Sequence, residues 1–186
     1  MKAASREALA TSQTRLDEIL AGDNNVATAA QAGLDIFEVV DVLDADRELR
    51  VAFTDIAAPS EARKSLAETL FGSKISGGAL RIIQEAAAAQ WSTPKDFVKG
   101  LVSLGRRALL RGAEAQGQLG QVEDELFRLS QILDREGELT QLLSDRTADS
   151  ARKRGLLANV LYGKVTMVTE ALALQAIGRP EQNPID

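Results

Sequence analysis

Apolar residues recur at steps of three and four along most of the chain, which places them on one face of an α-helix. In the first predicted helix, residues 5–21, this face carries Leu9, Leu16 and Leu20. The same pattern predicts four further helices in the first half of the chain, at residues 26–43, 46–53, 60–71 and 76–90. The sequence shows neither the alternation typical of a half-buried strand nor an Asn-Gly hairpin turn. The pattern therefore predicts an all-α fold.

The clearest helix-start signal is Thr93-Pro94-Lys95-Asp96. Thr93 can cap the helix, Pro94 suits its first position, and Asp96 can return a hydrogen bond from the third position. We expect this helix to run to about residue 115. A further helix carries its apolar stripe from Val122 to Leu133.

The sequence resembles itself when it is displaced by 90 residues. Phe37 then aligns with Phe127, Leu43 with Leu133, and Asp55 with Asp145. After shifts of a residue or two, Ser60-Glu61-Ala62-Arg63-Lys64 resembles Asp149-Ser150-Ala151-Arg152-Lys153, and Leu70-Phe71-Gly72 resembles Leu161-Tyr162-Gly163. We therefore predict two similar helical bundles, residues 1–93 and 94–178, joined by the long helix after Pro94. Residues 179–186 are expected to be a linker or a truncated end.

Composition narrows the possible chemistry. The 186 residues include no Cys and no His, which excludes disulfides, thiolate nucleophiles, cysteine zinc sites and histidine bases. The net charge is −5, which argues against non-specific binding to nucleic acid. No apolar run approaches the roughly 18 residues of a membrane span, and the first residues lack the apolar core of a signal peptide. We expect a cytoplasmic protein without direct membrane insertion.

Two groups of charged residues allow more than one interpretation. Asp35, Glu38 and Asp41 recur every third residue and predict a solvated face, a surface for a basic partner or, less favourably, a carboxylate metal site. Arg107 and Arg111 lie one turn apart, and we expect them to lie on a solvated face or to form salt bridges to neighbouring helices, rather than to bind phosphate or nucleic acid. We predict no catalytic residue, no metal site and no cofactor. A helical enzyme with carboxylate chemistry remains the least favoured alternative.

A family resemblance begins at Arg107-Ala108-Leu109-Leu110 and continues through the spaced leucines to Lys153, Leu156-Leu157 and Leu161. This order of spacings resembles the N-terminal helical domain of the delta subunit of bacterial F-type ATP synthase, the counterpart of the mitochondrial oligomycin-sensitivity-conferring protein. Residues 1–93 look like a second, divergent copy, similar to the extra N-terminal sequence of actinobacterial delta subunits. The family's C-terminal segment does not follow, so we expect the chain to be truncated before it.

The resemblance implies a non-catalytic stator subunit, peripheral to the cytoplasmic side of the cell membrane. Such a subunit binds N-terminal helices of alpha subunits and joins the catalytic head to the b-type peripheral stalk, so that the head does not turn with the rotor. In the family, the alpha helix lies along helices one and five of the bundle. The candidates on those helices for contact with an alpha helix are Leu9, Ala79, Ile83, Leu109, Ala113 and Leu172. The alternative is a generic helical adaptor or regulatory protein that binds an amphipathic partner helix.

Overall fold

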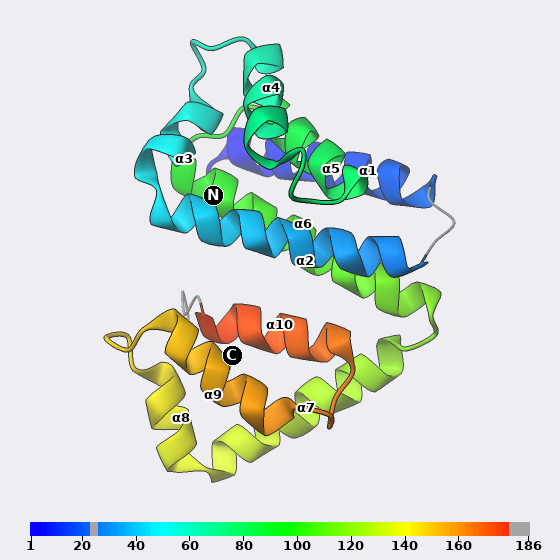
Figure 1. The fold of residues 1–186 in the computed structure, drawn as a ribbon, viewed down its shortest axis with the longest axis vertical. Helices are drawn as coiled ribbons and strands as arrows, with labels where there is room; N and C mark the ends of the chain where they lie inside the picture. The colour runs from blue at the N-terminus through cyan, green and yellow to red at the C-terminus, as the bar shows by residue number, and fades with distance from the viewer. Residues whose placement is uncertain (23–25, 179–186) are drawn as a thin grey trace. The chain divides into compact units, whose positions relative to one another are not determined.

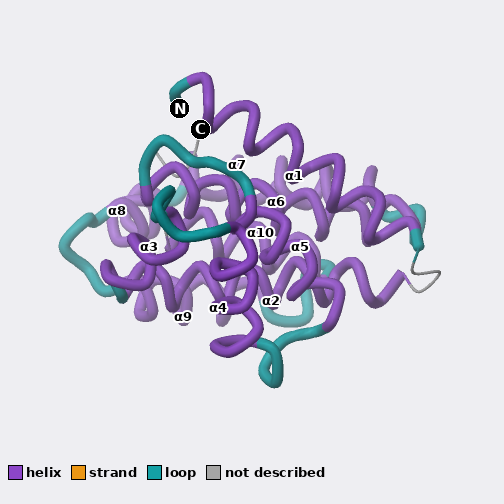
Figure 2. The backbone as a smooth tube through the Cα atoms, turned by 90° about the horizontal axis from the view of Figure 1, so that it is seen from above, coloured by secondary structure: helices purple, strands orange, loops and turns teal. Residues whose placement is uncertain are grey.

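The computed structural model describes residues 1–22 and 26–178, which form helices and loops without a strand (Figures 1 and 2). The helices are α1 (Ala3–Ala21), α2 (Val26–Ala45), α3 (Arg47–Thr54), α4 (Ser60–Phe71), α5 (Gly77–Ala88), α6 (Pro94–Ala115), α7 (Leu119–Arg135), α8 (Gly137–Ser144), α9 (Ser150–Leu161) and α10 (Met167–Gly178). The all-α prediction is confirmed. The expected linker at residues 179–186 lies outside the described residues.

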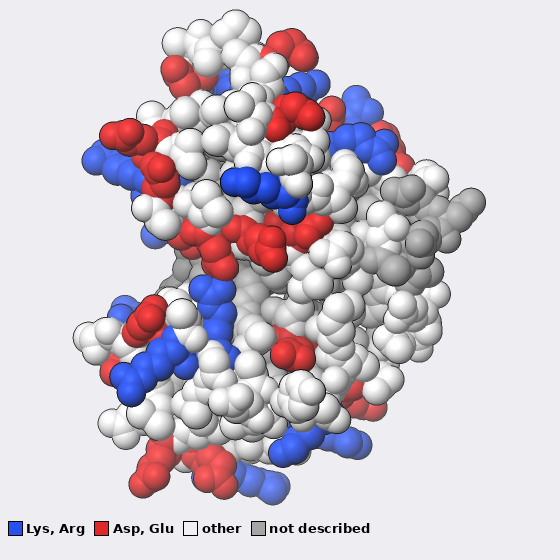
Figure 3. Space-filling view, in the orientation of Figure 1, with Lys and Arg blue, Asp and Glu red and all other residues white. Residues whose placement is uncertain are grey.

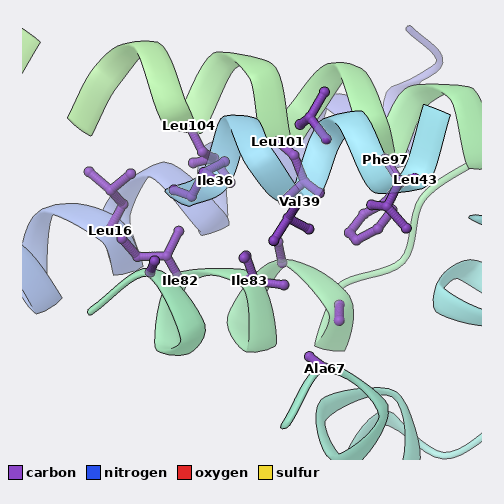
Figure 4. Packing of buried hydrophobic residues seen from close by; sticks show 14 of the residues in the cluster. Leu16, Ile36, Val39, Leu43, Ala67, Ile82, Ile83, Phe97, Leu101 and Leu104 are labelled. Atoms are coloured by element: carbon purple, nitrogen blue, oxygen red, sulfur yellow. The ribbon is translucent and has the colours of Figure 1, made fainter. Parts of the chain in front are cut away.

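The chain divides into two compact units, Met1–Gly112 and Ala113–Asp186. In the first unit, α2 lies between α5 on one side and α6 on the other (Figure 4). Its residues Ile36, Val39 and Leu43 are buried between Ile82 and Ile83 of α5 and a row on α6, which consists of Phe97, Leu101 and Leu104. This packing buries the apolar stripe of each helix, which is the main source of stability for such short helices.

The second unit has a smaller core built from α7, α8, α9 and α10. Leu129 and Leu133 of α7 pack with Leu143, Leu157 and Ile177. The turn between α6 and α7 contains Gly117, whose φ is 67°. Glycine reaches this left-handed conformation without strain.

The division between the units differs from the boundary expected after residue 93. Phe97, Leu101, Leu104 and Ala108 of α6 belong to the core of the first unit. Ser5 of α1 also binds the start of α6, since its hydroxyl donates to Asp96 Oδ2 at 2.7 Å. Most of α6 therefore completes the first unit, although a displacement of 90 residues places it at the position of α1 in the repeat.

Helices recur at a spacing of 90 residues: α3, α4 and α5 begin and end 90 residues before α8, α9 and α10. One tertiary contact recurs with them. Asp35 Oδ2 accepts from the backbone N–H of Ser76 at 2.8 Å, and Glu125 Oε2 accepts from that of Thr166 at 2.7 Å. The same spacing corrects one detail of the sequence alignment. Phe71 corresponds to Leu161, since both end a helix and are buried, and not to the exposed Tyr162.

Candidate partner-binding surface

The first pair of helices expected to hold a partner, α1 and α5, packs closely in the first unit. Ala79 and Ile83 have no exposed surface because they lie in the core of that unit. Leu9 is half-buried against the same core. In this conformation only Leu9 of these three offers a side chain to a partner.

The candidates from the second copy divide in the same way. Leu109 and Ala113 are fully buried, whereas Leu172 is half-buried. Leu109 fills the contact between α6 and α2, since a Cβ added to Gly33 would lie 2.6 Å from its Cγ. Leu109 therefore serves packing within the first unit, and Leu172 is the candidate of this group that retains exposed surface.

The rim of the α1–α5 pair is charged, a feature that the sequence analysis missed. Arg15 Nε of α1 lies 3.7 Å from Glu85 Oε2 of α5, and Lys64 Nζ lies 3.7 Å from Glu85 Oε1. Arg15 also contacts Glu18 at 2.8 Å. No local signal could have found the Arg15–Glu85 contact, because the two residues are far apart in sequence. A partner on this pair of helices meets Leu9 together with a charged rim, the usual composition at the edge of a protein interface.

A second charged cluster joins α1 to α6. Arg107 donates to Asp17 from Nε at 2.8 Å and from Nη2 at 2.6 Å, and Arg111 Nε donates to Asp17 Oδ1 at 2.8 Å. The hydrogen bond from Arg107 is the main cause that lowers the pKa of Asp17 below its usual value, and Arg111 contributes in the same direction. Of the two alternatives, a solvated face or salt bridges to a neighbouring helix, the structure shows the salt bridges.

The acidic stripe on α2 does not act as one cluster. Asp35 is buried and accepts from Gln31 Nε2 and from the backbone of Ser76, so it orders the loop before α5. Glu38 and Asp41 are exposed, and acidic side chains gather over α2 in Figure 3. Within the described residues, no group of three carboxylates has the arrangement of a metal site.

Trp91 is a packing residue. Its Nε1 donates to Ala86 O at 2.8 Å, its ring meets Phe97 edge-on with centroids 5.8 Å apart, and the side chain is buried. Its fluorescence therefore reports on the packing of α5 and α6.

The described residues define an all-helical protein that carries half-buried apolar side chains and charged pairs on its helix surfaces. A family model described as ATP synthase delta (OSCP) subunit matches residues 107–177. The whole chain is 77% identical to ATP synthase subunit delta of Corynebacterium aurimucosum, 64% identical to that of Corynebacterium glutamicum strain R and 60% identical to that of Corynebacterium diphtheriae. In each case the alignment covers 100% of this chain and 69% of the relative.

The chain belongs to the ATP synthase delta (OSCP) subunit family. Members of this family are non-catalytic subunits of the peripheral stalk, so the chain is not an enzyme in its own right. None of the helices in the described ranges, residues 1–22 and 26–178, combines the length and apolar character needed to cross a membrane.

Proposed function

We propose that the chain acts as a stator: it binds N-terminal helices of alpha subunits and links the catalytic head of an F-type ATP synthase to the peripheral stalk. The observation that carries this proposal is family membership across the full length of the chain, with the family model over residues 107–177. A stator needs a stiff body and lasting interfaces but no titrating catalytic group. The tightly packed core of the first unit meets the first requirement.

The surfaces proposed for the alpha helices lie on α1 with α5 and on α10. Leu9 and Leu172 would supply apolar contacts, because these two candidates retain exposed surface. Arg15 and Glu85 would meet charged residues at the edge of the alpha helix on the first unit. Ala79, Ile83, Leu109 and Ala113 would act indirectly, by fixing the helices that carry the surface.

The test is a titration with a peptide of the alpha-subunit N-terminus, followed by backbone NMR shifts. Leu9→Arg should remove binding at the first unit, and Leu172→Arg should remove binding at the second. Leu142→Arg on α8 is the matched control, since Leu142 is an exposed leucine on neither surface. The absence of a saturable shift, or an equal effect of Leu142→Arg, would contradict the proposal. Unchanged Trp91 fluorescence would show that the first unit of Leu9→Arg remains folded, and unchanged backbone NMR shifts away from the substituted residue would show the same for the second unit of Leu172→Arg and Leu142→Arg.

The remaining partner and the origin of the repeat are also proposals. We place the attachment to the b-type stalk subunit partly in sequence beyond these 186 residues, because the relatives are longer than the chain. The chain would then lie peripherally, on the cytoplasmic side of the cell membrane. The 90-residue recurrence of α3–α5 supports duplication of one bundle, with residues 1–93 and 94–178 as the copies.

A further inference from the structure

The turn that follows α9 exposes large apolar side chains that its counterpart in the first unit lacks. α4 and α9 occupy equivalent places in the 90-residue recurrence, and each leads through a turn into the next helix. After α9, Tyr162 is 83% exposed and Met167 is 52% exposed. The positions 90 residues earlier, after α4, hold Gly72 and Gly77. Among the large apolar residues in the described ranges, Tyr162 is the most exposed.

The same apolar surface extends along the outer side of α9. One side of this helix packs against α10 in the second unit (Figure 1), and the opposite side is exposed. Arg152, Leu156 and Asn159 lie on the exposed side at spacings of four and three residues. Tyr162 comes three residues later, and its backbone N–H still donates to Ala158 O as in a helix. We define the α9 face as Arg152, Gly155, Leu156, Asn159 and Tyr162.

The segment that carries the α9 face is basic. Residues 150–169 contain four basic residues and no acidic residue, whereas residues 60–79 contain three basic and two acidic residues. Of the four basic residues, Arg152 and Lys164 are exposed. One precedes the apolar residues of the α9 face in the chain and the other follows them, so a positive charge flanks these residues at each end.

The first unit balances the charge at this place within its own helix. Glu61 and Glu68 of α4 correspond to Ala151 and Ala158 of α9. Glu61 Oε1 lies 3.5 Å from Lys64 Nζ on the same helix. α9 contains no acidic residue, so its exposed positive charge has no such neighbour on its own helix.

We propose that the α9 face binds an acidic amphipathic helix of another ATP synthase subunit. The family places this chain in the ATP synthase complex, so the partner is sought there. An acidic partner matches the positive charge of Arg152 and Lys164. Its apolar side would cover Leu156 and Tyr162 and remove their surface from water. This interface is separate from the proposed alpha-subunit contact at Leu172 and does not depend on it.

The shape of α9 favours a helix as the partner. Side chains at spacings of three and four residues form ridges, and a second helix packs its own ridges between them. Gly155 leaves room in the middle of the face, since a Cβ added there would meet nothing within 4 Å. Leu156 is 38% exposed, whereas its counterpart Leu66 packs against the first core. From Arg152 to Tyr162 the face is about 15 Å long, which matches about three turns of a partner helix.

The first test measures cysteine alkylation in the full-length protein, both free and in the assembled ATP synthase. Mass spectrometry identifies the labelled peptide. Asn159→Cys should react at least about tenfold more slowly in the assembled complex than in the free protein. Thr69→Cys is the matched control, because Thr69 is the exposed counterpart of Asn159 on α4, and it should react at the same rate in both. Equal rates for Asn159→Cys, or equal protection of Thr69→Cys, would overturn the proposal.

The second test measures the chemistry of the partner with a designed helical peptide of 18 residues, with leucines on one side and glutamates beside them. Fluorescence anisotropy of the labelled peptide should show saturable binding to the full-length protein. Tyr162→Gly, which restores the residue of the first unit, should weaken binding at least about tenfold. Ala151→Glu should weaken it at least about threefold. Because glutamate is favourable in the first turn of a helix, this variant keeps its fold, which circular dichroism checks.

Three results of the peptide experiment would overturn the proposal. Equal binding of a peptide with lysines in place of the glutamates would exclude recognition by charge. Loss of binding in Leu172→Arg would assign the peptide to the α10 surface. Binding to vesicles of phosphatidylglycerol that Tyr162→Gly removes, without binding of the acidic peptide, would assign the α9 face to a lipid surface.

Discussion

Arg107 and Asp17 form a two-pronged ion pair that ties α6 to α1, with nitrogen–oxygen distances of 2.8 and 2.6 Å. The two residues are 90 residues apart, which is the displacement of the repeat, so they occupy equivalent positions in α1 and α6. Arg111 adds a third contact to the same carboxylate. The side chain of Asp17 is 26% exposed, so solvent screens this cluster less than it screens a fully exposed pair. The cluster therefore helps to hold α6 against α1 in the first unit.

Removal of Asp17 should weaken the first unit measurably. We expect Asp17→Ala and Arg107→Ala to show a coupling free energy of about 1 kcal/mol in a double-mutant cycle, because paired geometry raises a partly exposed ion pair above the usual surface value. Urea unfolding measures it. The control pair is Arg15 and Glu18, which is more exposed and within one helix, and should couple by about 0.3 kcal/mol. A coupling at Asp17 no larger than in the control would contradict the interpretation.

The same carboxylate should make stability depend on pH. Arg107 lowers the pKa of Asp17 in the folded protein, so folding is favoured by its ionised form. This stabilisation is fully present above the unfolded pKa of about 3.9 and is lost as the pH falls through the lower folded pKa. The stability difference between the native chain and Asp17→Asn should therefore shrink between pH 6 and pH 3 in urea unfolding. Asp145 also has a lowered pKa, but it is present in both proteins and cancels. A constant difference would exclude this role for Asp17.

Arg63 should contribute more to stability than any exposed arginine. It is buried, and its guanidinium donates to the carbonyl oxygens of Ala87, Ala88, Ala58 and Asp55 at 2.7, 3.1, 2.6 and 3.0 Å. Arg63→Ala leaves these acceptors without the donor, so we expect a loss of about 3 kcal/mol and a melting temperature lower by about 10 °C. Arg47→Ala, at an exposed position, should change stability by less than about 0.5 kcal/mol.

The equivalent position offers an internal check on Arg63. Lys153, 90 residues later, is also buried, so the second unit places a lysine where the first has an arginine. Arg63→Lys should therefore recover part of the stability that Arg63→Ala loses, while the loss of several donors prevents full recovery. Thermal unfolding followed by circular dichroism compares the three proteins. A lysine variant no more stable than the alanine variant would show that charge at this site contributes nothing.

The sequence predicted the helices well because their signals are local. The helix expected from Pro94 to about residue 115 runs over Pro94–Ala115, and Thr93 caps it as predicted. The Asp96 carboxylate, which could have accepted a hydrogen bond from the start of its own helix, accepts instead from the hydroxyl of Ser5, a buried residue of α1. Such a choice between a local and a distant partner depends on packing that no spacing rule contains.

The candidate surface was harder to predict for the same reason. Periodicity identifies the apolar side of α5, but it does not say how much of that side another helix covers. Ala79 and Ile83 lie on the apolar side that the first core buries, whereas Leu9 lies near its edge. The charged rim formed by Arg15 and Glu85 depends on two segments 70 residues apart in sequence. Family resemblance indicated the helices, and the structure separates their exposed residues from their buried ones.

Gly100 of α6 should be intolerant of a side chain because of Trp91. A Cβ at this position would lie 2.2 Å from Trp91 Cη2, and the indole is held by its bond to Ala86 O and by Phe97. Gly100→Ala should therefore displace the ring, lower stability by about 1–3 kcal/mol and shift the emission of this single tryptophan to longer wavelength. Gly155→Ala in the middle of α9 is the control: a Cβ there meets nothing within 4 Å, so alanine's higher helix propensity should stabilise by about 0.5–1 kcal/mol. Urea unfolding followed by circular dichroism measures both, and a Gly100→Ala protein as stable as the native chain would show that the Trp91 contact can relax without cost.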